Sequence, residues 1–438
     1  MIMTSTSVGG VPLEEGSLIE GDWPEWFVAS RKRGWEEFQS LSVPGAKDEA
    51  WRFSRLKALK LEGFRYPGVV SNAADLVSRS TGLGEASARF VFGNNRLLSA
   101  TAPAADLVKA GLVVMPLEEA ARVHADLVKG HFMTQEARLG SAKYAALHRS
   151  GPVAGVFIHV PRGLTVPQPI EIFHWVEGKN SAVFPHTLIV CEPGSRATVV
   201  DCFRSADDEP AFACGVNDLV VGEGGRLDYV AVQQWSLAAT AMHLNSTSVS
   251  REATCLGMQV NLGGGFVRNE NDSRMEGEGA RSDMLSINIS AGEQMIDQRT
   301  FQDHAQPGAA SDLLYQNALT GKGRTVFSGV IRVQPGAHRT DAYQKVRNIM
   351  LSDEAEANSM PGLEIEADDV RCTHGATTSE VDDRELFYLR ARGIRPDQAK
   401  QLLVMGFFNT VLERLPDEKL RAHLESLTGQ RLAAALQS

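Results

Sequence analysis

The sequence predicts a mainly β protein with helical ends. We divide it into an N-terminal helical and mixed α/β cap over residues 1–150, a β core over 151–379 and a C-terminal helical domain over 380–438. Within the core, short runs of alternating apolar and polar residues are separated by glycine turns, without helical periods between them. Several turn signals lie about 14 or 15 residues apart, or about twice that. Such spacing is typical of the rungs of a solenoid.

Composition narrows the class of protein. The chain has 438 residues, a formal net charge of -10 and a pI of about 5.6, which gives no electrostatic support for nucleic-acid binding. The first residues lack a basic start followed by an apolar run, so we expect no signal peptide, and no stretch is apolar enough to span a membrane. The five cysteines are an odd number and widely spread, which is typical of reduced thiols. We therefore expect a cytoplasmic protein.

The cap begins with aromatic residues at helical spacing. Between about Gly21 and Phe64, five large rings recur three, four or a few more residues apart: Trp23, Trp26, Phe27, Trp35 and Phe38. We interpret them as the buried faces of a helix pair rather than as a ligand-stacking box. The rest of the cap mixes short apolar runs with alanine-rich helical stretches such as residues 117–129.

The core contains at least eight apolar-alternating runs, GVFIHV, TLIVCE, ATVVDCF, DLVVGE, LDYVAV, MLSINIS, TVFSGVIRV and LEIEA. Regular short strands without intervening helices argue against a doubly wound sheet. A sandwich or jelly roll and a solenoid both remain open on this pattern. Polar stretches such as residues 269–282 favour the solenoid, because a stacked coil can hold them as an exposed rung.

The sharpest chemical feature lies where the core gives way to the helical tail. Residues 363–367 alternate as a strand, and Cys372 and His374 then fall on one face of an extended chain. Residues 375–379 are expected to form a turn, after which Asp382 or Asp383 can cap a helix. A thiol and an imidazole would therefore lie side by side at the end of the sheet.

The tail after this helix predicts two more helices. One is expected to open at Pro396 and end at Pro416, and the second to run from about Asp417 to Leu436. A hairpin of this size cannot bury all of its apolar residues alone, so we expect it to dock on the solenoid. It could also bind another subunit.

Three segments carry a family resemblance. They read FSGVIRVQPGAHRTDAYQKVRNIMLSDEAEANSMPGLEIEADDVRCTHGATTS, ELFYLRARGI and LLVMGFFNTV, and together they cover about a third of the chain. These segments resemble the SufB/SufD family of iron–sulfur cluster assembly proteins, as does the short motif KDEAWRFS that begins at Lys47. The resemblance is closer to the SufD branch. SufB-type chains typically carry a cysteine where this chain has Ala357, Asn358 and Ser359, and another where it has Leu389.

The resemblance implies a right-handed parallel β-helix core and a scaffold subunit without its own P-loop. It implies a heterodimer with a SufB-like paralogue and a complex with a SufC-type ABC ATPase, and it leaves a homodimer of the isolated chain open. His374 carries over as the functional metal site, with Cys372 as a weaker second donor, for a transient iron–sulfur cluster shared with the partner. A flavin in the complex is compatible with the resemblance, although no residue here marks one. The residues expected to bind partners are Leu386, Phe387, Tyr388, Arg390, Arg392, Phe407 and Phe408.

The residues themselves indicate half of a metal site. Cys372 and His374 would lie about 6.6 Å apart along a strand that rises about 3.3 Å per residue. This spacing is too long for a good thiolate–imidazole hydrogen bond, but it suits two ligands of one metal. Clusters take about four ligands, and no C-x-x-C or C-x-x-H pair completes the set. The last coil of a solenoid also leaves an unpaired strand edge, which a second chain could cover.

Several alternatives stay open. Cys372 could be the nucleophile of an enzyme with His374 as its base, or the chain could be a purely structural subunit. Cys191, Cys202 and Cys214 are spaced by about one rung and could relay sulfur along the bore, although buried cysteines are more often apolar fillers. Cys255 has no assigned role. His304 and His338 adjoin turns, where we expect hydrogen bonds to pin them rather than a metal.

Overall fold

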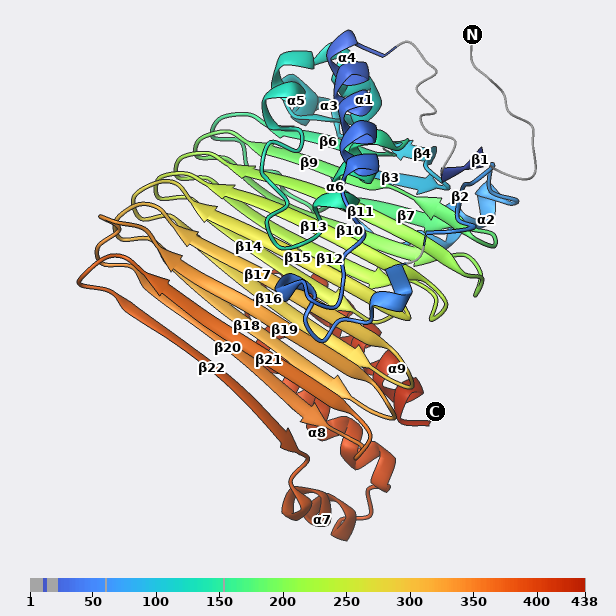
Figure 1. Cartoon of the computed structure of the whole chain (residues 1–438), viewed down its shortest axis with the longest axis vertical. Helices are drawn as coiled ribbons and strands as arrows, with labels where there is room; N and C mark the ends of the chain where they lie inside the picture. The colour runs from blue at the N-terminus through green and yellow to red at the C-terminus, as the bar shows by residue number, and fades with distance from the viewer. Residues whose placement is uncertain (1–10, 14–22, 60, 153, 438) are drawn as a thin grey trace.

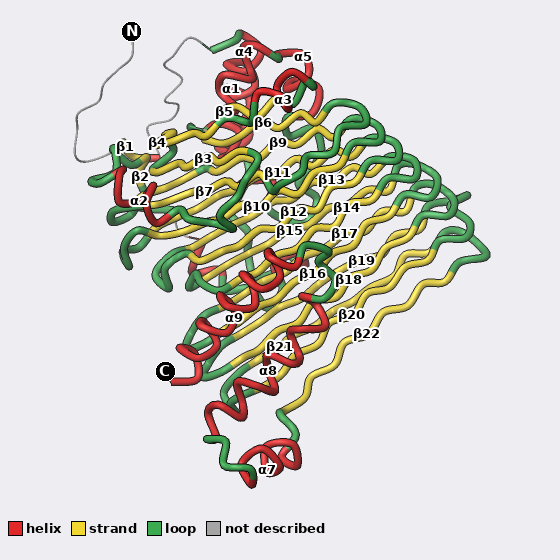
Figure 2. The backbone as a smooth tube through the Cα atoms, turned by 180° about the vertical axis from the view of Figure 1, so that it is seen from behind, coloured by secondary structure: helices red, strands yellow, loops and turns green. Residues whose placement is uncertain are grey.

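The structure, a computed structural model, describes residues 11–13, 23–59, 61–152 and 154–437. Its core is a parallel β-helix in which two long sheets face each other (Figure 1, Figure 2). From β10 onward, successive strands alternate between the sheets, so each strand pairs with the strand two places later. The predicted solenoid with helical ends is therefore confirmed. The sandwich and jelly-roll alternatives are excluded, because those folds are antiparallel.

Sheet A of the core consists of β6 (Ala154–Val160), β8 (Ser181–Val183), β9 (Pro185–Cys191), β11 (Ala211–Val221), β13 (Thr240–Val249), β15 (Phe266–Met275), β17 (Met295–His304), β19 (Arg324–Val333) and β21 (Glu356–Ile365). Sheet B consists of β7 (Ile170–Val176), β10 (Arg196–Ser205), β12 (Arg226–Gln234), β14 (Thr254–Asn261), β16 (Arg281–Ser290), β18 (Ala310–Leu319), β20 (Asp341–Met350) and β22 (Arg371–Glu380). Arg226 pairs with Thr254 and Asp341 with Arg371, so the partners lie 28 and 30 residues apart. One coil therefore spans two of the turn spacings seen in the sequence.

The in-register pairing stacks residues of the same parity in columns along the inside of the solenoid. On β20, the buried residues Ala342, Gln344, Val346 and Asn348 alternate with more exposed ones. Their register partners on β22 are Cys372, His374, Ala376 and Thr378, which therefore point to the same side. The last strand thus continues the inward columns of the coils before it.

One inward column of sheet B is a ladder of side-chain amides. Asn261 donates to Asn288 at 2.7 Å, Asn288 to Asn317 at 2.8 Å and Asn317 to Asn348 at 2.7 Å. Asn348 donates to Thr378 Oγ1 at 3.1 Å, which brings the ladder to the last strand. Stacked coils place identical positions close enough for these bonds, so the amides of this column satisfy one another inside the solenoid.

The polar stretch at residues 269–282 also places hydrogen-bonded side chains inside the solenoid. We expected it to form an exposed rung, but Asn269, Glu270 and Ser273 on β15 are all buried. Asn269 donates to Asn261, and Ser273 to Ser282, inside the solenoid. Glu270 lies on the opposite face, where the cap covers the sheet.

The cap extends both sheets and covers part of sheet A. Its strands are β1 (Val11–Pro12), β2 (Arg65–Tyr66) and β5 (Val113–Pro116) in sheet A, and β3 (Ala88–Gly93) and β4 (Arg96–Thr101) in sheet B. Its helices are α1 (Glu25–Ser40), α2 (Ala73–Arg79), α3 (Ala105–Lys109), α4 (Leu117–Val123), α5 (Ala125–His131) and α6 (Ala142–Ser150), with 3₁₀ helices at Glu49–Trp51 and Leu56–Leu59. The segment 1–17, for which we expect no signal peptide, is described only at 11–13.

The aromatic cluster of the cap is a packed core. Trp23 stacks on Phe27 with ring centroids 4.7 Å apart, and Phe27 contacts Phe132, which directly follows α5, at 5.4 Å. These contacts bury Phe27, whereas Trp23, Trp26, Trp35 and Phe38 are only partly buried. The segment also forms one α-helix, α1, and not the expected helix pair.

The KDEAWRFS motif fastens the cap to the solenoid through a buried charge cluster. Arg268 of β15 lies 3.7 Å from the ring centroid of Trp51 and donates to the Ala50 carbonyl at 2.9 Å. It also forms ion pairs of 2.7 Å with Glu270 and with Asp297 of β17. Every group in this cluster is buried and paired, which is the condition under which charges are tolerated in an interior.

Three helices follow the last strand: α7 (Asp383–Ala391), α8 (Pro396–Leu412) and α9 (Glu418–Gln437). Val404 and Phe408 of α8 are fully buried in one hydrophobic cluster with Leu285 and Leu314 of sheet B. The hairpin of α8 and α9 therefore docks on the solenoid, as predicted. By contrast, α7 lies beyond the last coil (Figure 1), and no residue of this fully described helix is buried. Among the described helices, none has the length and apolar character needed to cross a membrane.

Candidate functional site

The open end of the solenoid is formed by its last two strands. Among the described strands, β22 pairs only with β20, and β21 pairs only with β19, so each sheet ends in a free edge. Figure 1 shows β22 as the outermost strand of the stack. A free edge presents unpaired backbone N–H and C=O groups to a partner.

The strand that carries the site is longer than the sequence predicts. We expected residues 375–379 to be a turn, but they belong to β22, which runs to Glu380. The turn lies earlier, at residues 366–370, where Asp369 has a φ of 54° and the consecutive acids Asp368 and Asp369 interrupt the apolar alternation. Gly375 is paired in register with Lys345 of β20 and has an ordinary strand conformation, without a positive φ. It therefore does not form the expected turn.

Cys372 lies at the mouth of the interior. Its side chain is half-buried and packs with Ile331, Val333 and Ala342 from the preceding strands. Burial raises the pKa of the Cys372 thiol, and the nearby Asp341 carboxylate raises it further. A thiol held in its protonated form is a poor nucleophile, so this environment disfavours the enzyme alternative.

His374 lies two residues further along the same face and is exposed. Its register neighbour on β20 is the buried Gln344, which in turn faces Gly329 of sheet A. The residue one coil beyond Gly329 is Pro361, in register with it. The imidazole therefore stands at the rim, with a polar amide below it.

The site contains two soft or borderline donors and no third. Among the described residues, no group of three or more His, Cys, Asp or Glu side chains is placed to hold a metal ion. The positions that in SufB-type chains provide a cysteine, Ala357 to Ser359, lie on β21 in the opposite sheet of the same coil. The structure therefore brings together Cys372 and His374 but does not complete a ligand set around them.

The residues predicted to bind partners fall into two groups. Phe387 and Tyr388 of α7 are 73% and 56% exposed, and Arg392 stacks on Tyr388 at 4.3 Å. Arg390 is also exposed and Leu386 is partly so. Phe407 is half-buried beneath Arg347. Phe408 is the exception, because it is fully buried against sheet B. We therefore assign it to the hydrophobic core and no longer to the partner surface.

The other thiols do not line a common path. Cys191 and Cys255 lie in the interior cluster, Cys202 lies on the outer face of sheet B, and Cys214 lies on the outer face of sheet A. The sulfur relay through the bore is therefore wrong for Cys191, Cys202 and Cys214. A spacing of about one rung did not predict a common path, because each of these three thiols lies on a different face of the solenoid. Burial raises the pKa of Cys191 and of Cys202 to about 12.

The histidines near turns are held by hydrogen bonds, as expected. The Nε2 atom of His304 lies 2.9 Å from Ser311 Oγ, and the Nδ1 atom of His338 lies 3.0 Å from the Asp368 carbonyl.

The sequence did not predict a buried network between α6 and sheet A. In this network His148 Nε2 contacts His186 Nδ1 at 2.9 Å, and His186 Nε2 contacts Asp218 at 3.2 Å. No local motif joins these three residues, so only the fold brings them together.

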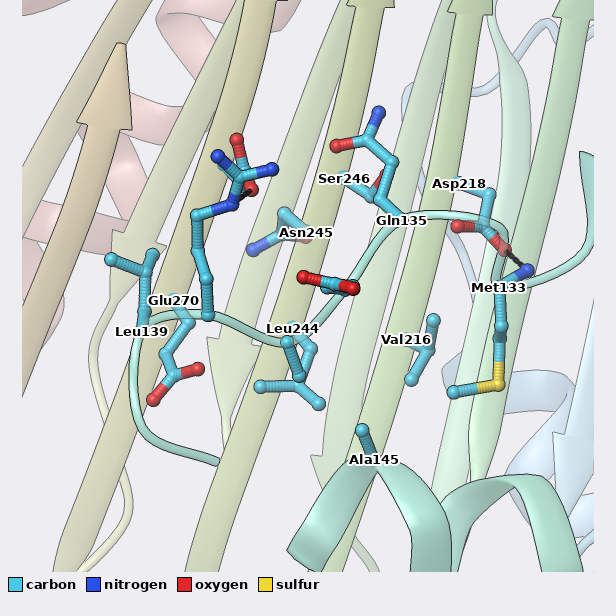
Figure 3. A pocket seen from close by; sticks show the side chains of 14 residues that line it. Met133, Gln135, Leu139, Ala145, Val216, Asp218, Leu244, Asn245, Ser246 and Glu270 are labelled. Atoms are coloured by element: carbon cyan, nitrogen blue, oxygen red, sulfur yellow. Dashed lines mark hydrogen bonds and ion pairs between the residues drawn. The ribbon is translucent and has the colours of Figure 1, made fainter. Parts of the chain in front are cut away.

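A cavity of about 50 Å³ lies beside this network (Figure 3). Asp218 and Asp272 both line the cavity. Asp218 accepts from the backbone N–H of Met133 at 2.7 Å, and Asp272 pairs with Arg138 at 2.9 Å. Glu270 is already bonded to Arg268 and Ser141. Asp218, Glu270 and Asp272 are therefore engaged by the protein, and the open end with His374 remains the better candidate.

Comparison with known proteins gives two family matches and several relatives. Residues 174–407 match the family described as SUF system FeS cluster assembly, SufBD core domain, and residues 13–172 match the SufBD protein N-terminal region. Over 335 residues the chain is 28% identical to iron–sulfur cluster assembly protein SufD of Bacillus subtilis, covering 75% of each chain. It is 30% identical over 293 residues to SufD of Escherichia coli, covering 65% of this chain and 69% of that protein. A SufBD family protein of Synechocystis is 26% identical over 432 residues, which cover 96% of this chain and 94% of that protein.

Proposed function

Because the chain belongs to the SufBD family of SUF-system iron–sulfur cluster assembly proteins, we propose that it is the SufD-like subunit of a scaffold that builds and transfers nascent clusters. In this proposal it pairs with a SufB-like paralogue, and a SufC-type ATPase supplies the nucleotide hydrolysis. The iron–sulfur cluster is the cargo of the scaffold rather than a resident cofactor.

The observation that carries the proposal is the place of His374. The imidazole is exposed on the inward face of β22, at the free end of both sheets, with the Cys372 thiol two residues away. Imidazole and thiolate are ligands that iron–sulfur clusters accept. A buried His374 would have had no access to a partner or to iron.

An incomplete ligand set suits assembly better than storage. His374 and Cys372 provide at most two donors, so the remaining ligands of a nascent cluster would come from the partner across the free edge. Such a shared cluster is released when the two chains separate. In this proposal His374 binds iron or moves a proton as sulfide joins the cluster.

Two surfaces suit the proposed partners. The free edges of β21 and β22 offer backbone hydrogen bonds to a second solenoid, either a SufB-like chain or a second copy of this chain. The exposed rings of Phe387 and Tyr388 lie on a helix that buries none of its own residues. Exposed apolar clusters of this kind mark protein-binding sites, and we assign this one to the ATPase.

Replacement of the imidazole tests the proposal. We expect His374→Ala to fold and to co-purify with a SufB-like chain and the ATPase, since the side chain is exposed and contributes little to stability. We expect the reconstituted assembly to lose most of its cluster, measured as bound iron and acid-labile sulfide per complex and by visible absorption.

The matched control is Thr373→Ala, which changes the neighbouring residue on the opposite face of β22. It should retain the wild-type cluster content. Full cluster content in His374→Ala would contradict the proposal and would leave a purely structural subunit as the better description.

A further inference from the structure

Gln344 lies directly beneath His374 in the inward column of sheet B. The two residues are register partners on adjacent parallel strands, and both point into the solenoid. Gln344 is 1% exposed, whereas His374 is exposed. A buried amide therefore lies next to the exposed imidazole in this column.

The amide of Gln344 is unsatisfied. Neither its Nε2 nor its Oε1 atom has a hydrogen-bond partner among the described residues, although both are buried. An unpaired buried amide costs free energy, and a methionine of similar shape would avoid that cost. The Gln344 amide is therefore free to form a hydrogen bond with a neighbouring group.

The space around this amide is provided by a glycine. A Cβ atom on Gly329 of β19 would lie 2.3 Å from Gln344 Nε2 and 2.3 Å from Thr300 Oγ1. Gly329 has no positive φ that would require glycine for backbone reasons. The missing side chain therefore makes room for the Gln344 amide at the level of His374.

The neighbouring column shows that register partners in this sheet can bond to each other. Asn317 donates to Asn348 at 2.7 Å, and Asn348 donates to Thr378 on β22 at 3.1 Å. Asn348 and Gln344 lie on the same strand, four residues apart and facing the same way. The same step from β20 to β22 separates Gln344 from His374, so the register places these two side chains next to each other in their own column.

We propose that Gln344 is a positioning residue for His374: its Oε1 atom accepts the N–H of one ring nitrogen and so leaves the other nitrogen free to face the open end. This inference deepens the proposed function and rests on it for its biological meaning. Histidines that bind metals usually donate their second ring N–H to a carbonyl, a carboxylate or water, which fixes the tautomer and the ring orientation. Gln344 is the carbonyl group that this chain places there.

The tautomer of His374 is the direct measurement. In the full-length chain with ¹⁵N-labelled histidine, the two ring nitrogens of His374 are assigned by their loss in His374→Ala, and their shifts report which nitrogen carries the proton. We expect one tautomer to dominate in the wild type. In Gln344→Met the tautomer ratio should change about fivefold, the effect of losing one hydrogen bond.

A second variant, at Gly329, displaces the Gln344 amide without replacing Gln344 itself. Gly329→Ala should displace Gln344 and shift the tautomer ratio in the same direction as Gln344→Met. Its matched control is Gly362→Ala on β21, where an added Cβ meets no atom closer than 3.6 Å. This control should leave the ratio unchanged. If Gly329→Ala does not fold, Gln344→Met decides alone, because removing an unpaired amide should preserve the fold.

The outcomes separate this inference from the proposed function. An unchanged tautomer ratio in Gln344→Met overturns the inference, even if His374→Ala abolishes cluster formation. A changed ratio supports it, even if His374→Ala builds clusters normally, in which case the proposed function fails instead. If a purely structural role for Gln344 applied, Gln344→Met would alter only the melting temperature.

Discussion

At the scale of single residues, Asp201 is the clearest buried acid. It is fully buried inside the solenoid, where Thr187 donates to it at 2.6 Å and Tyr229 at 3.0 Å. Burial raises its pKa from 3.8 to about 7, despite these two hydrogen bonds. His174 lies 3.4 Å away, and burial lowers its pKa to about 3, so it is neutral at physiological pH.

This raised pKa predicts a pH-dependent stability. The folded state holds the Asp201 proton more tightly than the unfolded state, so the contribution is complete below about pH 4 and is lost as pH rises through about 7. Between pH 5 and pH 8 we expect a loss of about 1–3 kcal/mol in the free energy of unfolding from this group. Urea denaturation at the two pH values measures it.

Asp201→Asn is the variant that isolates the effect. Asparagine keeps an oxygen that accepts from Thr187 and Tyr229 but does not titrate. The difference between the stabilities at pH 5 and pH 8 should therefore shrink by about the same 1–3 kcal/mol. An undiminished pH dependence in this variant would assign it to other groups.

The charge cluster around Arg268 gives a second prediction at this scale. Asp297→Ala would leave the buried guanidinium groups of Arg268 and Arg299 without their shared carboxylate. Removing one partner of a buried ion pair typically costs about 3–5 kcal/mol, so we expect a loss of that size in urea denaturation. Glu223→Ala, in the exposed pair with Arg251, serves as the control and should unfold like the wild type.

The sequence identified Cys372 and His374 but not the residues that surround them. A thiol and an imidazole two positions apart are visible in any extended segment, because strand geometry alone places them on one face. Gln344 lies 30 residues before His374, and nothing in its neighbourhood marks it. Only the register between β20 and β22 makes these two residues neighbours.

At the scale of elements, the end of β22 and the tail helices show where local patterns fail. Residues 375–379 look like a turn because they combine glycine with small polar residues, yet pairing with β20 keeps them extended. Tertiary contacts also determine which of Phe407 and Phe408 is buried. Adjacent phenylalanines on a helix cannot be assigned to a buried or an exposed face until the surface on which the helix docks is known. The helix starts after Asp382 and at Pro396 were marked by a capping residue and a proline and were predicted well, whereas α8 ends at Leu412 and not at Pro416 as expected.

The two phenylalanine positions give a matched pair of variants. Phe408→Ala should lower the free energy of unfolding by about 3–5 kcal/mol, because it opens a cavity between α8 and sheet B. Phe387→Ala, on the exposed face of α7, should change it by less than about 0.5 kcal/mol. In a co-purification assay, Phe387→Ala should nevertheless reduce the amount of bound ATPase. Normal binding by Phe387→Ala would remove α7 from the proposed interface.

At the scale of the whole molecule, the stack has one free end that the cap does not cover. The cap adds β3 and β4 to sheet B, and β1, β2 and β5 to sheet A, whereas the C-terminal helices dock on a face and leave the edges of β21 and β22 free. The solenoid class, the helical ends and the free edge followed from turn spacing and from the family resemblance. The faces on which the four buried cysteines lie could not be predicted in this way. Turn spacing fixes the length of a coil, but it does not determine whether a given residue points inward or outward.

The free edge predicts association of the isolated chain. The N–H of Arg371 donates to the Thr340 carbonyl, so in a parallel ladder the N–H groups of the even-numbered residues of β22 point outward. Ala376→Pro would remove one outward donor without touching a bond to β20. We expect wild-type protein to form a concentration-dependent dimer in sedimentation experiments and Ala376→Pro to remain monomeric.

The control for this variant is Ala376→Ser, which retains the N–H and should dimerise like the wild type. A monomer at all concentrations in the wild type would restrict edge pairing to the SufB-like partner. A dimer of Ala376→Pro as stable as that of the wild type would place the contact elsewhere.

The regular register of the coils also limits how a chain of this kind can change in length during evolution. Each strand touches the strands one coil before and after it, and partners lie 28 to 30 residues apart in the pairs of β12 with β14 and β20 with β22. Gain or loss of a single residue within a strand would turn its apolar side toward the solvent. Duplication of a complete coil would preserve every inward column, so relatives of different length should differ by whole coils or in the loops at the rim.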